Sequence, residues 1–445
     1  MPIEVCSISG FSKTEGNSVA IKIDDQVIIL DMGLSMSDYI TYTEDREDVS
    51  AKTYKELLKA NAVPDYGFIE EWKEKVVAIV PSHGHLDHVG AIPFAASLFP
   101  TAPIISTPYT IEVIKSITYD EKIQIPNRLV TINLNSSFKV SDSITLEFVN
   151  MTHSIPHTAV VVVHTPYGKI MYANDFKLDD RPILGKKPNY ERLKELGNEG
   201  IKLLIMNCLY AHEHKKCPSE SVAKQMLKDV MLGVNSEGKA MIVTTFSSHL
   251  ARLKSIIELG QQLNRKIVFL GRSLEKYVHA AERIDLVQFS KDIILLRHRD
   301  KVAKMLARIQ KEGREKYLIV CTGHQGEPKA MLSRIARGEL EFRFGPGDIV
   351  VFSCQVIPVE VNKRNREKLE SVLREKNIRI FRDVHVSGHA HREDHRDLLE
   401  MIRPEHIMPI HAEPAKGKMI AELAEQLGIG TTHVMKDGKR LVLPS

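Results

Sequence analysis

The sequence predicts an α/β protein built from two unlike parts, and two observations carry that prediction. In roughly the first half, short β-branched runs such as 76–80 recur, and clusters of His and Asp directly follow several of them. From about Cys208 onward, apolar runs of strand length alternate regularly with runs of helix length. We therefore expect a sandwich of sheets flanked by helices in the first part and a parallel sheet covered by helices in the second.

Length and composition fit a soluble globular protein of more than one domain. The chain has 445 residues, of which 43% are hydrophobic and 27% are charged. No apolar run is long enough to span a bilayer, the N-terminus lacks the pattern of a signal peptide, and the five cysteines form no CxxC pair. These features predict a cytoplasmic protein that has no membrane association.

The net charge of +4 is too small to identify a partner, but basic residues are concentrated in residues 297–316. A helix in that segment would carry a basic face suited to phosphates. The same pattern also fits an ordinary solvated helix face, and the sequence leaves both interpretations open.

The first candidate site residue is Asp31, which follows two predicted strands in residues 19–30. An aspartate at that place can cap a turn. Beside a metal site it can instead accept a hydrogen bond from the distal N–H of a ligand histidine and fix the orientation of the ring. We favour the second role because a strong metal motif follows.

That motif is His83-Gly84-His85-Leu86-Asp87-His88, directly after the predicted strand at 76–80. Imidazole nitrogens and carboxylate oxygens are the ligands that Zn²⁺ and similar divalent ions prefer. One tight loop can present His83 and His85 to one ion, and Asp87 and His88 to a second. A solvated polar loop is the alternative interpretation.

Three further candidate ligands also follow predicted strands: His153, Asp175 and His411. Asp175 ends a predicted hairpin, and its two oxygens could bridge two cations held about 3.5–4 Å apart. His157 lies close to His153 in sequence, and we expect it to support the site or the fold instead of binding metal.

In the second part, two loops that lead from a strand into a helix could bind phosphate. One contains Gly323, Gln325, Gly326 and Glu327, and the other contains Ser247 and Ser248. Backbone N–H groups at the start of a helix favour an anion, although a tight turn alone also requires glycines. A third polar loop, 384–391, carries three histidines, for which a plain surface loop is the alternative.

Together, these segments resemble the ribonuclease J family, a group of β-CASP nucleases in the metallo-β-lactamase superfamily. The resemblance rests on motifs spread over nearly the whole chain: His83-x-His85-x-Asp87-His88, Thr245-Phe246-Ser247-Ser248, Gly271-Arg272-Ser273, Gly323-x-Gln325-Gly326-Glu327-Pro328 and His385-x-Ser387-Gly388-His389. The sequence is most similar to the short archaeal type. It departs from the family at Cys208-Leu209, where an acidic residue followed by Ser or Thr is usual.

The resemblance implies an αββα metallo-β-lactamase sandwich formed by residues 1–207 and 375–445, with a β-CASP domain inserted at 208–374. It implies a ribonuclease that uses two divalent ions, with Zn²⁺ favoured and Mn²⁺ or Mg²⁺ as alternatives. The expected activity is 5′-to-3′ exonucleolytic hydrolysis of 5′-monophosphate RNA in RNA decay or maturation. An endoribonuclease and a catalytically weak RNA-binding subunit are the alternatives. The preference for RNA or DNA as the substrate stays open. Single-stranded RNA, RNA-decay or processing proteins and a second copy of the chain are the expected partners.

Specific roles follow for the site residues. We expect His83, His85 and His153 to bind the first ion, Asp87, His88 and His411 to bind the second, and Asp175 to bridge them. Asp87 would also orient the attacking water, and His389 would protonate the leaving oxygen. The residues expected to hold phosphate groups are His385, Ser387, Gly388, Ser247, Ser248, Gly323, Gln325, Gly326 and Glu327.

Overall fold

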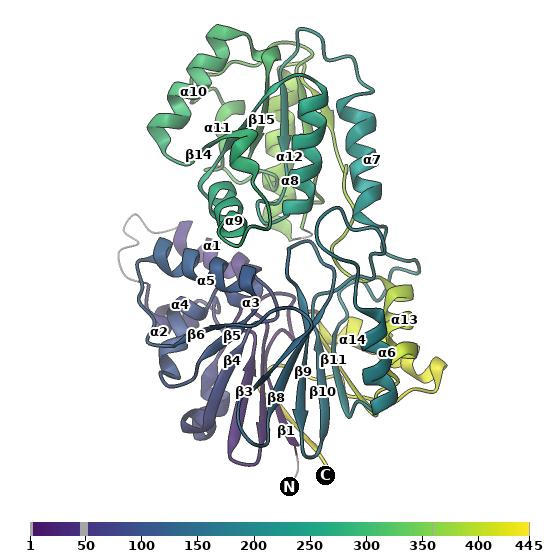
Figure 1. Cartoon of the computed structure of the whole chain (residues 1–445). Coiled ribbons are helices and arrows are strands. Elements are labelled where there is room, and N and C mark those ends of the chain that lie inside the picture. The colour runs from purple at the N-terminus through teal and green to yellow at the C-terminus, as the bar shows by residue number, and fades with distance from the viewer. Residues whose placement is uncertain (1–2, 45–51, 358, 445) are drawn as a thin grey trace. The chain divides into compact units, whose positions relative to one another are not determined.

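The computed structural model describes residues 3–44, 52–357 and 359–444, which form two compact units (Figure 1). Unit 1 comprises Met1–Asp180, Lys186–Cys217 and Gly388–Ser445, and unit 2 comprises Arg181–Gly185 and Pro218–Ser387. Unit 2 is therefore inserted in the sequence of unit 1. The α/β fold class is confirmed, and the boundaries expected at 208 and 374 stay predictions.

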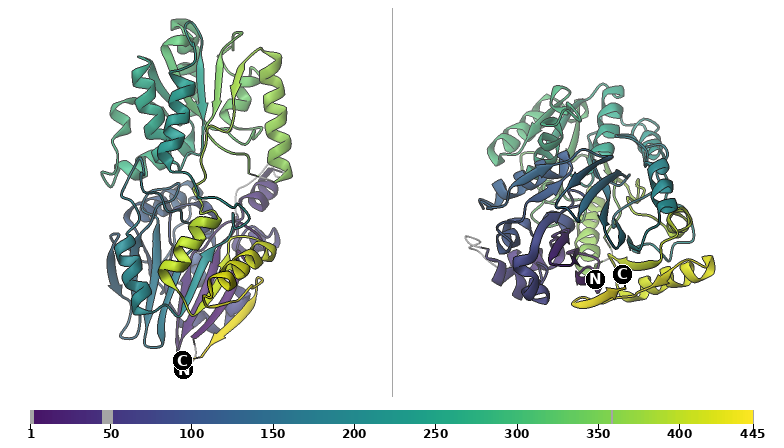
Figure 2. Two further views of the ribbon diagram at one scale, coloured as in Figure 1. Left: turned by 90° about the vertical axis from the view of Figure 1, so that its right-hand side faces the viewer. Right: turned by 60° about the horizontal axis from the view of Figure 1, so that its bottom comes forward.

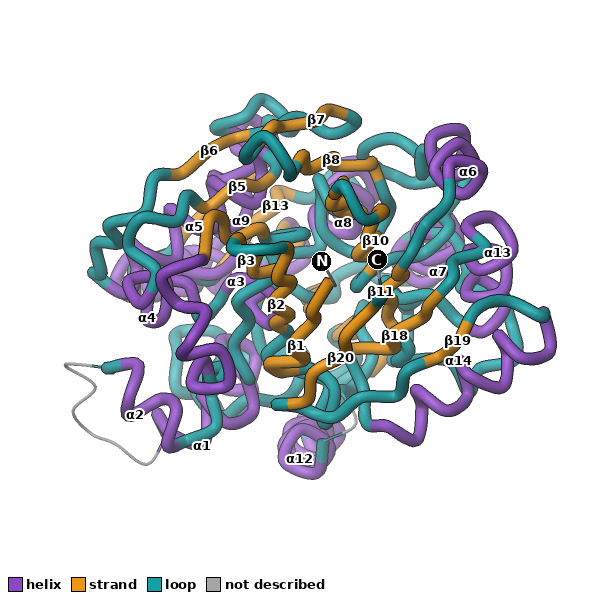
Figure 3. Tube along the Cα trace, turned by 90° about the horizontal axis from the view of Figure 1, so that it is seen from below, coloured by secondary structure: helices purple, strands orange, loops and turns teal. Residues whose placement is uncertain are grey.

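Unit 1 contains two seven-stranded sheets. The first has the order β20 (Lys439–Leu443), β1 (Ile3–Ser9), β2 (Ser18–Ile23), β3 (Gln26–Leu30), β4 (Val76–Val80), β5 (Ile104–Ser106) and β6 (Leu129–Thr131). The second has the order β19 (Thr431–Thr432), β18 (His406–Ile410), β11 (Leu203–Asn207), β10 (Gly168–Ala173), β9 (Ala159–Thr165), β8 (Thr145–Asn150) and β7 (Ser136–Lys139). Strands from the end of the chain thus join both sheets, β20 beside β1 and β18 beside β11 (Figure 3).

The alternation of side chains along the strands builds the layers of the sandwich, as β9 illustrates. Val161 and Val163 pack in the core that both sheets share, whereas Val160 and Val162 pack in a second core with helices. The helices of that second core are α6 (Tyr190–Glu199), α13 (Arg392–Ile402) and α14 (Pro414–Leu427), which cover the outer face of the second sheet (Figure 2). The first sheet is contacted by α5 (Pro108–Glu121) and by the 3₁₀ segment η1 (Tyr66–Lys75).

Short helices fill the connections of unit 1. They are α1 (Met36–Glu44), α2 (Tyr54–Lys59), α3 (Leu86–Val89), α4 (Ile92–Ala95) and the 3₁₀ turn η2 (Ala96–Leu98). Of these, α2 begins after Thr53, which caps it. The Thr53 side chain accepts a hydrogen bond from the Glu56 amide, and the Glu56 carboxylate accepts one from the Thr53 amide.

Unit 2 is a six-stranded sheet whose neighbouring strands are all parallel, as the alternating pattern predicted. Its order is β14 (Ile293–Leu296), β13 (Lys266–Leu270), β15 (Tyr317–Cys321), β12 (Met241–Thr244), β16 (Ile349–Phe352) and β17 (Arg379–Phe381). Its helices are α7 (Glu220–Met231), α8 (Leu250–Gln262), α9 (Arg272–Glu282), α10 (Arg299–Glu312), α11 (Met331–Ala336) and α12 (Glu360–Glu375), with 3₁₀ turns η3 (Phe289–Lys291) and η4 (Arg314–Lys316).

The four inner strands of unit 2 correspond to predicted strands, whereas the edge strands β14 and β17 were not predicted. Both are short and partly exposed: β14 has four apolar residues, of which one is exposed, and β17 has only three residues and begins with the exposed Arg379. The basic segment at 297–316 does form a helix, α10. Among the described residues, no helix is both long and apolar enough to cross a lipid bilayer.

Candidate metal centre

The candidate ligands of unit 1 meet because the strands that precede them end at the same edge of the sandwich. In the first sheet, β3 and β4 run parallel. In the second sheet β10, β11 and β18 run parallel, and β8 shares their direction because β9 is antiparallel to both β8 and β10. Their carboxyl ends therefore carry the site residues Asp31, His83, His85, Asp87, His88, His153, Asp175 and His411.

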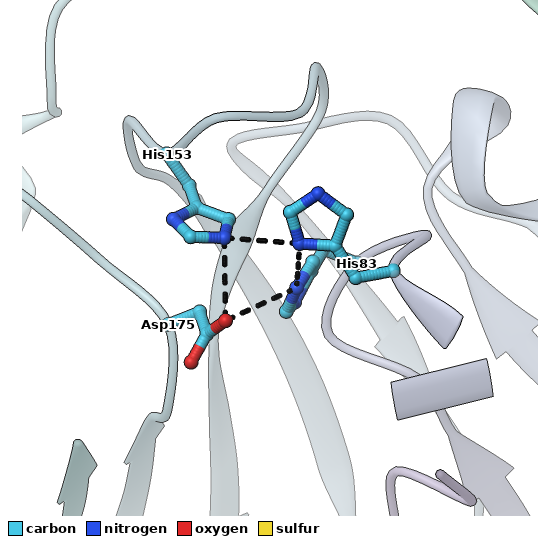
Figure 4. Close-up of side chains that lie close together, drawn as sticks. His83, His153 and Asp175 are labelled. Atoms are coloured by element: carbon cyan, nitrogen blue, oxygen red, sulfur yellow. Dashed lines mark hydrogen bonds and ion pairs between the residues drawn. The ribbon is translucent and has the colours of Figure 1, made fainter. Parts of the chain in front are cut away.

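The first group of converging atoms contains His83, His85, His153 and Asp175. The Nδ1 atom of His85 lies 3.2 Å from Nε2 of His83 and 3.1 Å from Nε2 of His153. The Oδ2 atom of Asp175 lies 3.2 Å from Nε2 of His153 and 3.5 Å from Nε2 of His83. Figure 4 shows the rings of His83 and His153 directed at this carboxylate.

These spacings fit a tetrahedral ion. Four ligand atoms about 2.0–2.1 Å from a central Zn²⁺ are separated from one another by about 3.3 Å. Four of the six separations in the first group lie between 3.1 and 3.5 Å, and all six are within 4.8 Å. Three imidazole nitrogens and one carboxylate oxygen are also a donor set that suits zinc.

The second group contains Asp87, His88, Asp175 and His411. The Nε2 atom of His88 lies 3.3 Å from Oδ2 of Asp175 and 3.4 Å from Oδ2 of Asp87. The Nδ1 atom of His411 lies 3.7 Å from Oδ1 of Asp175 and 3.9 Å from Oδ2 of Asp87. This group is wider than the first and richer in carboxylate oxygen, which also suits harder ions such as Mn²⁺.

Asp175 belongs to both groups, and the expectation that its two oxygens bridge two ions stays a prediction, with Oδ1 3.7 Å from Nδ1 of His411. Its Oδ2 faces ring nitrogens of both groups, His83 and His153 in the first and His88 in the second. This oxygen is buried and accepts no hydrogen bond within the described part of the chain. One oxygen of Asp175 is therefore placed to be shared between two cations.

Asp31 lies where the sequence analysis expected it, against a ligand histidine. Its Oδ2 is 2.6 Å from Nδ1 of His88 and accepts hydrogen bonds from the hydroxyls of Ser82 and Tyr172. Ser82 also donates its backbone N–H to Oδ1 of Asp31, and its hydroxyl lies 3.0 Å from Nδ1 of His83. One buried carboxylate thus fixes His88 directly and His83 through Ser82, which leaves the Nε2 atom of each ring directed at Asp175.

The remaining ligands have their own supports. Nδ1 of His153 lies 2.6 Å from the carbonyl oxygen of Gly388, which directs its Nε2 toward the first group. His411 adopts a left-handed backbone conformation, with φ of 69°, and its amide donates to the carbonyl oxygen of Gly10. The side-chain amide of Asn17 lies 2.8 Å from Nδ1 of His411, the same nitrogen that faces Asp87 and Asp175, so Asn17 contacts the ligand atom itself.

Burial and the neighbouring charges set the protonation of the cluster. Burial lowers the pKa of His83 and His85 well below the usual value, so both rings are neutral and able to bind a cation. Burial would also lower the pKa of His88, but the carboxylates of Asp87, Asp175 and Asp31 outweigh it and raise that pKa well above the usual value. Without a cation, the carboxylates therefore draw a proton onto His88.

His389 lies at the border of this cluster. Its ring centroid is 4.9 Å from that of His153 and 5.3 Å from that of His411, and its Nδ1 is 3.6 Å from Oδ1 of Asp175. The side chains of His389 and Asp87 keep 21% and 24% exposure, whereas His83 and His88 are fully buried. Solvent therefore reaches the cluster where His389 and Asp87 lie.

His157, expected to be supporting, contacts the helix α5 instead of the cluster. Its Nδ1 accepts a weak hydrogen bond, 3.4 Å long, from the amide of Tyr109. Its carbonyl oxygen accepts one from the hydroxyl of Thr107. These contacts fit a structural role.

The structure adds two residues that sequence reasoning missed, Asn17 and Asn207. Asn207 is fully buried at the end of β11, and its amide lies 2.9 Å from Oδ1 of Asp175 and 3.3 Å from Nδ1 of His389. Cys208, which drew attention as a departure from the family, instead directs its thiol at the carbonyl oxygen of Ile410. Asn207 follows the apolar residues of β11 directly, and a polar residue in that position is the sequence feature that could have identified it.

The candidate phosphate loops of unit 2 lie after β12 and β15, next to each other at the carboxyl edge of the sheet. The hydroxyl of Ser247 is 2.9 Å from that of Ser273, which belongs to the Gly271-Arg272-Ser273 segment. Ser248 is buried ahead of α8. In an open α/β sheet, ligands bind outside the carboxyl ends of the strands.

The loop after β15 is held mainly by its own contacts. The side chain of Gln325 donates to the carbonyl oxygen of Gln355 and accepts from the amide of Ile357, and the Glu327 carboxylate accepts from the Gln325 amide. Gly326 has φ of 80°, and a Cβ there would lie 2.4 Å from the backbone of Asn365. Gly323 also has a positive φ, and α11 is only six residues long. These features show a loop that requires glycine for packing.

In the loop before Gly388, His385 is anchored by a buried arginine. Nη1 of Arg252 lies 3.4 Å from Nδ1 of His385 and donates to the carbonyl oxygens of Ser353 and Val384. Ser387 is buried, and Gly388 permits a close approach, because a Cβ there would lie 2.6 Å from the hydroxyl of Ser154.

Three family models match this sequence, and together they cover most of it. Residues 60–215 match a beta-lactamase superfamily domain, and residues 238–369 match the beta-CASP domain of ribonuclease J. Residues 375–435 match a domain described as the RNA specificity domain of Zn-dependent metallo-hydrolases. The metallo-β-lactamase and β-CASP parts expected from the sequence are therefore confirmed.

Similar proteins extend this match to the full length. Ribonuclease J of Methanocaldococcus jannaschii is 40% identical, over 99% of this chain and 99% of that protein. The chain belongs to the ribonuclease J family. Ribonuclease J of Pyrococcus abyssi is 43% identical over 96% of this chain and 93% of that protein.

More distant similarities are consistent with this family. Ribonuclease J 1 of Streptococcus pyogenes is 29% identical, and this chain covers 75% of its length. A crystal structure of a protein of unknown function from Enterococcus faecalis covers the whole chain with a TM-score of 0.67 at 18% identity. That second similarity concerns the fold alone. The predicted resemblance to the ribonuclease J family is thus confirmed at full length.

Proposed function

We propose that this protein is a metal-dependent ribonuclease that shortens 5′-monophosphate RNA in the 5′-to-3′ direction. The observation that carries the proposal is the meeting of seven ligand side chains, from distant segments, in two groups that both contain Asp175. Membership in the ribonuclease J family supports RNA as the substrate.

Two divalent ions in these groups would lower the pKa of a water nucleophile and neutralise the charge of a phosphodiester. The roles of the protein's own residues follow from their placement. His83 and His88 are buried and fixed, so they hold position without reorganising. Asp87 is partly exposed beside the second group, where its carboxylate can orient the attacking water.

His389 is the candidate for protonating the leaving oxygen. It is partly exposed at the border of the cluster and does not belong to either ligand group. Its Nδ1 lies 3.6 Å from Oδ1 of Asp175 and 3.3 Å from Nδ2 of Asn207. A partly exposed imidazole beside a phosphodiester can donate its proton to the 3′-oxygen that departs.

The 5′-to-3′ direction requires recognition of a terminal phosphate, and unit 2 offers polar groups for it. The Ser247 and Ser273 hydroxyls lie together at the carboxyl edge of the parallel sheet, and α8 begins just after Ser248. Hydroxyls and backbone N–H groups at a helix start suit a phosphate that carries more charge than an internal diester. His385, Ser387 and Gly388 are proposed to hold a phosphate nearer the scissile bond.

The direct test is digestion of one RNA sequence that carries a 5′-monophosphate, a 5′-triphosphate or a 5′-hydroxyl, with DNA of the same sequence alongside. We expect mononucleotide release to be fastest from the monophosphate RNA, because a hydroxyl end would leave the phosphate donors unpaired. Equal rates on the three ends with only internal products would identify an endoribonuclease. No cleavage by a chain with both metal groups filled would identify an RNA-binding subunit.

Metal identity is tested separately, by elemental analysis of the purified chain. We propose Zn²⁺ in the first group, because its separations fit a tetrahedral ion and its donors are mostly nitrogen. Mn²⁺ or Mg²⁺ remains the alternative for the second group. A cytoplasmic location, RNA-decay partners and a homodimer stay predictions that rest on the family resemblance.

A further inference from the structure

We propose that Asn207 is a positioning residue that holds Asp175 in the orientation that both metal groups require. The inference rests on the proposed metal-dependent function and names a residue that controls it. Asn207 ends β11, which lies between β10 and β18, the strands that lead to Asp175 and His411. It is fully buried.

The orientation of the Asn207 amide is fixed by its neighbours. Its Oδ1 accepts a hydrogen bond from the backbone N–H of Leu209, at 2.9 Å, so the oxygen and nitrogen of the amide are distinguished. The opposite end, Nδ2, therefore donates to Oδ1 of Asp175, also at 2.9 Å. Both contacts have the length of ordinary hydrogen bonds.

Holding Oδ1 determines what Oδ2 can do. A carboxylate that rotates about its Cβ–Cγ bond exchanges its two oxygens, but the bond from Asn207 resists that rotation. Oδ2 then stays between the ring nitrogens of His83, His88 and His153, at 3.2–3.5 Å. Asn207 thereby supports the use of one Asp175 oxygen by both groups.

The same amide nitrogen also faces His389. Nδ2 of Asn207 lies 3.3 Å from Nδ1 of that ring. An N–H donor directed at Nδ1 favours the neutral form of the ring that carries its proton on Nε2. Asn207 therefore links the orientation of the bridging carboxylate to that of the candidate proton donor, and it adds no charge to the cluster.

The test replaces Asn207 by Leu, which has a similar volume and no donor, and uses Cys208→Ser as the matched control. Cys208 is the next residue and equally buried, but it contacts the carbonyl oxygen of Ile410 and no ligand group. Metal-stripped proteins are titrated with Zn²⁺ against a chromogenic chelator. We expect Asn207→Leu to bind Zn²⁺ about 10- to 100-fold more weakly, the usual effect of removing a partner of a ligand. Cys208→Ser should match the wild type.

Two further measurements separate positioning from a structural role. The melting temperature of the metal-stripped variants should stay close to the wild type, while the increase caused by Zn²⁺ should shrink in Asn207→Leu. For RNA cleavage, kcat should fall while KM is unchanged. A folded Asn207→Leu chain with wild-type Zn²⁺ affinity and kcat would overturn the proposal.

If Asn207→Leu does not fold, Asn207→Ser is the test variant, because its smaller side chain keeps one hydrogen-bond donor. Its Zn²⁺ affinity should be lower than that of the wild type but not lost. An unchanged affinity would overturn the proposal. A wild-type chain that binds no Zn²⁺ and cleaves no RNA would overturn the proposed function itself, which is a different result.

Discussion

The two units each present polar residues at the carboxyl edge of a sheet, but the residues differ in kind. At the edge of unit 1 they are imidazoles and carboxylates that face one another, such as His83, His153 and Asp175. At the edge of unit 2 they are hydroxyls, amides and glycines, and many of them bond to the neighbouring backbone, as Gln325 does. The edge of unit 1 is suited to binding cations. The edge of unit 2 is suited to binding an anion through uncharged hydrogen-bond donors.

The difference also concerns what holds each edge together. In unit 1, ring nitrogens that lie 3.1–3.2 Å apart oppose each other unless a proton or a cation lies between them. In unit 2, the loop 323–327 is fixed by the hydrogen bonds of Gln325 and Glu327 and by the packing of Gly326 on Asn365. We infer that unit 1 depends on bound ions for its local order and that unit 2 does not.

The largest expected effect is that of Asp175→Ala, since this residue belongs to both ligand groups. Loss of a bridge between two cations removes several kcal/mol of transition-state stabilisation, so turnover should fall by about three orders of magnitude or more. Elemental analysis should show fewer than two ions per chain. Glu147→Gln, which changes a buried carboxylate paired with His164 and Arg192, is the control and should keep both ions. Wild-type turnover in Asp175→Ala would contradict the metal assignment.

His389→Ala tests whether the residue beside the two ligand groups has a different role from the ligands themselves. Because His389 lies outside both ligand groups, its loss should leave the metal content unchanged. Turnover should fall by about 10²- to 10⁴-fold, the usual contribution of a proton donor. Loss of one ion from this variant would show that His389 is a ligand and would refute the distinction.

Much of the unit 1 edge could be predicted from sequence because its residues are chemically distinctive and follow recognisable strands. His83, His153 and Asp175 each come after a predicted strand, and their side chains are ligands that divalent metals prefer. The supporting residues could not be predicted in this way. Asn17 and Asn207 are uncharged, and their partners lie 394 and 32 residues away in sequence.

The sequence was less informative about which strands pair and about why particular glycines are required. Nothing local indicates that β20 joins β1 or that β18 joins β11, because those pairings depend on the whole chain. The glycines at 323 and 326 predicted a phosphate cradle, but the positive φ and close packing of Gly326 also give it a structural reason. A glycine pattern alone could not separate the two explanations.

Arg252→Met addresses the stability of unit 2 and should have an intermediate effect. The Arg252 guanidinium is fully buried and pairs with Glu220 through two hydrogen bonds, so its removal leaves the buried carboxylate with His249, 3.4 Å away, as its remaining ionic contact among the described residues. Unfolding free energy should fall by about 3–5 kcal/mol. The double variant with Glu220→Gln should recover part of this loss. Equal stability of Arg252→Met and the wild type, measured with denaturant, would show that the pair is dispensable.

Ser247→Ala tests whether an uncharged hydroxyl at the edge of unit 2 contributes to recognition of the RNA end, and its effect should be small. Removing one hydroxyl that donates to a terminal phosphate costs about 0.5–1.5 kcal/mol, which corresponds to about a threefold to tenfold loss. We expect that loss in the preference for monophosphate over hydroxyl ends, with metal content unchanged. Ser141→Ala, a serine of unit 1 that contacts Gln26 and Ser143, is the control. An unchanged preference would exclude Ser247 from end recognition.

Acid stability tests unit 1 away from the metal groups. Burial would raise the pKa of Glu147, but its contacts with His164 and Arg192 outweigh it and lower that pKa from 4.5 to about 2. Because the folded-state pKa is the lower one, ionised Glu147 stabilises the fold above pH 4.5, and this contribution is lost as the pH falls from 4.5 toward 2. The difference in unfolding free energy between the wild type and Glu147→Gln should therefore shrink over that range, measured by urea denaturation from pH 6 to pH 3. If this difference in unfolding free energy stays constant between pH 6 and pH 3, the charge of Glu147 does not stabilise the fold. Unit 1 would then depend less on ion pairs away from its metal groups than the contacts of Glu147 indicate.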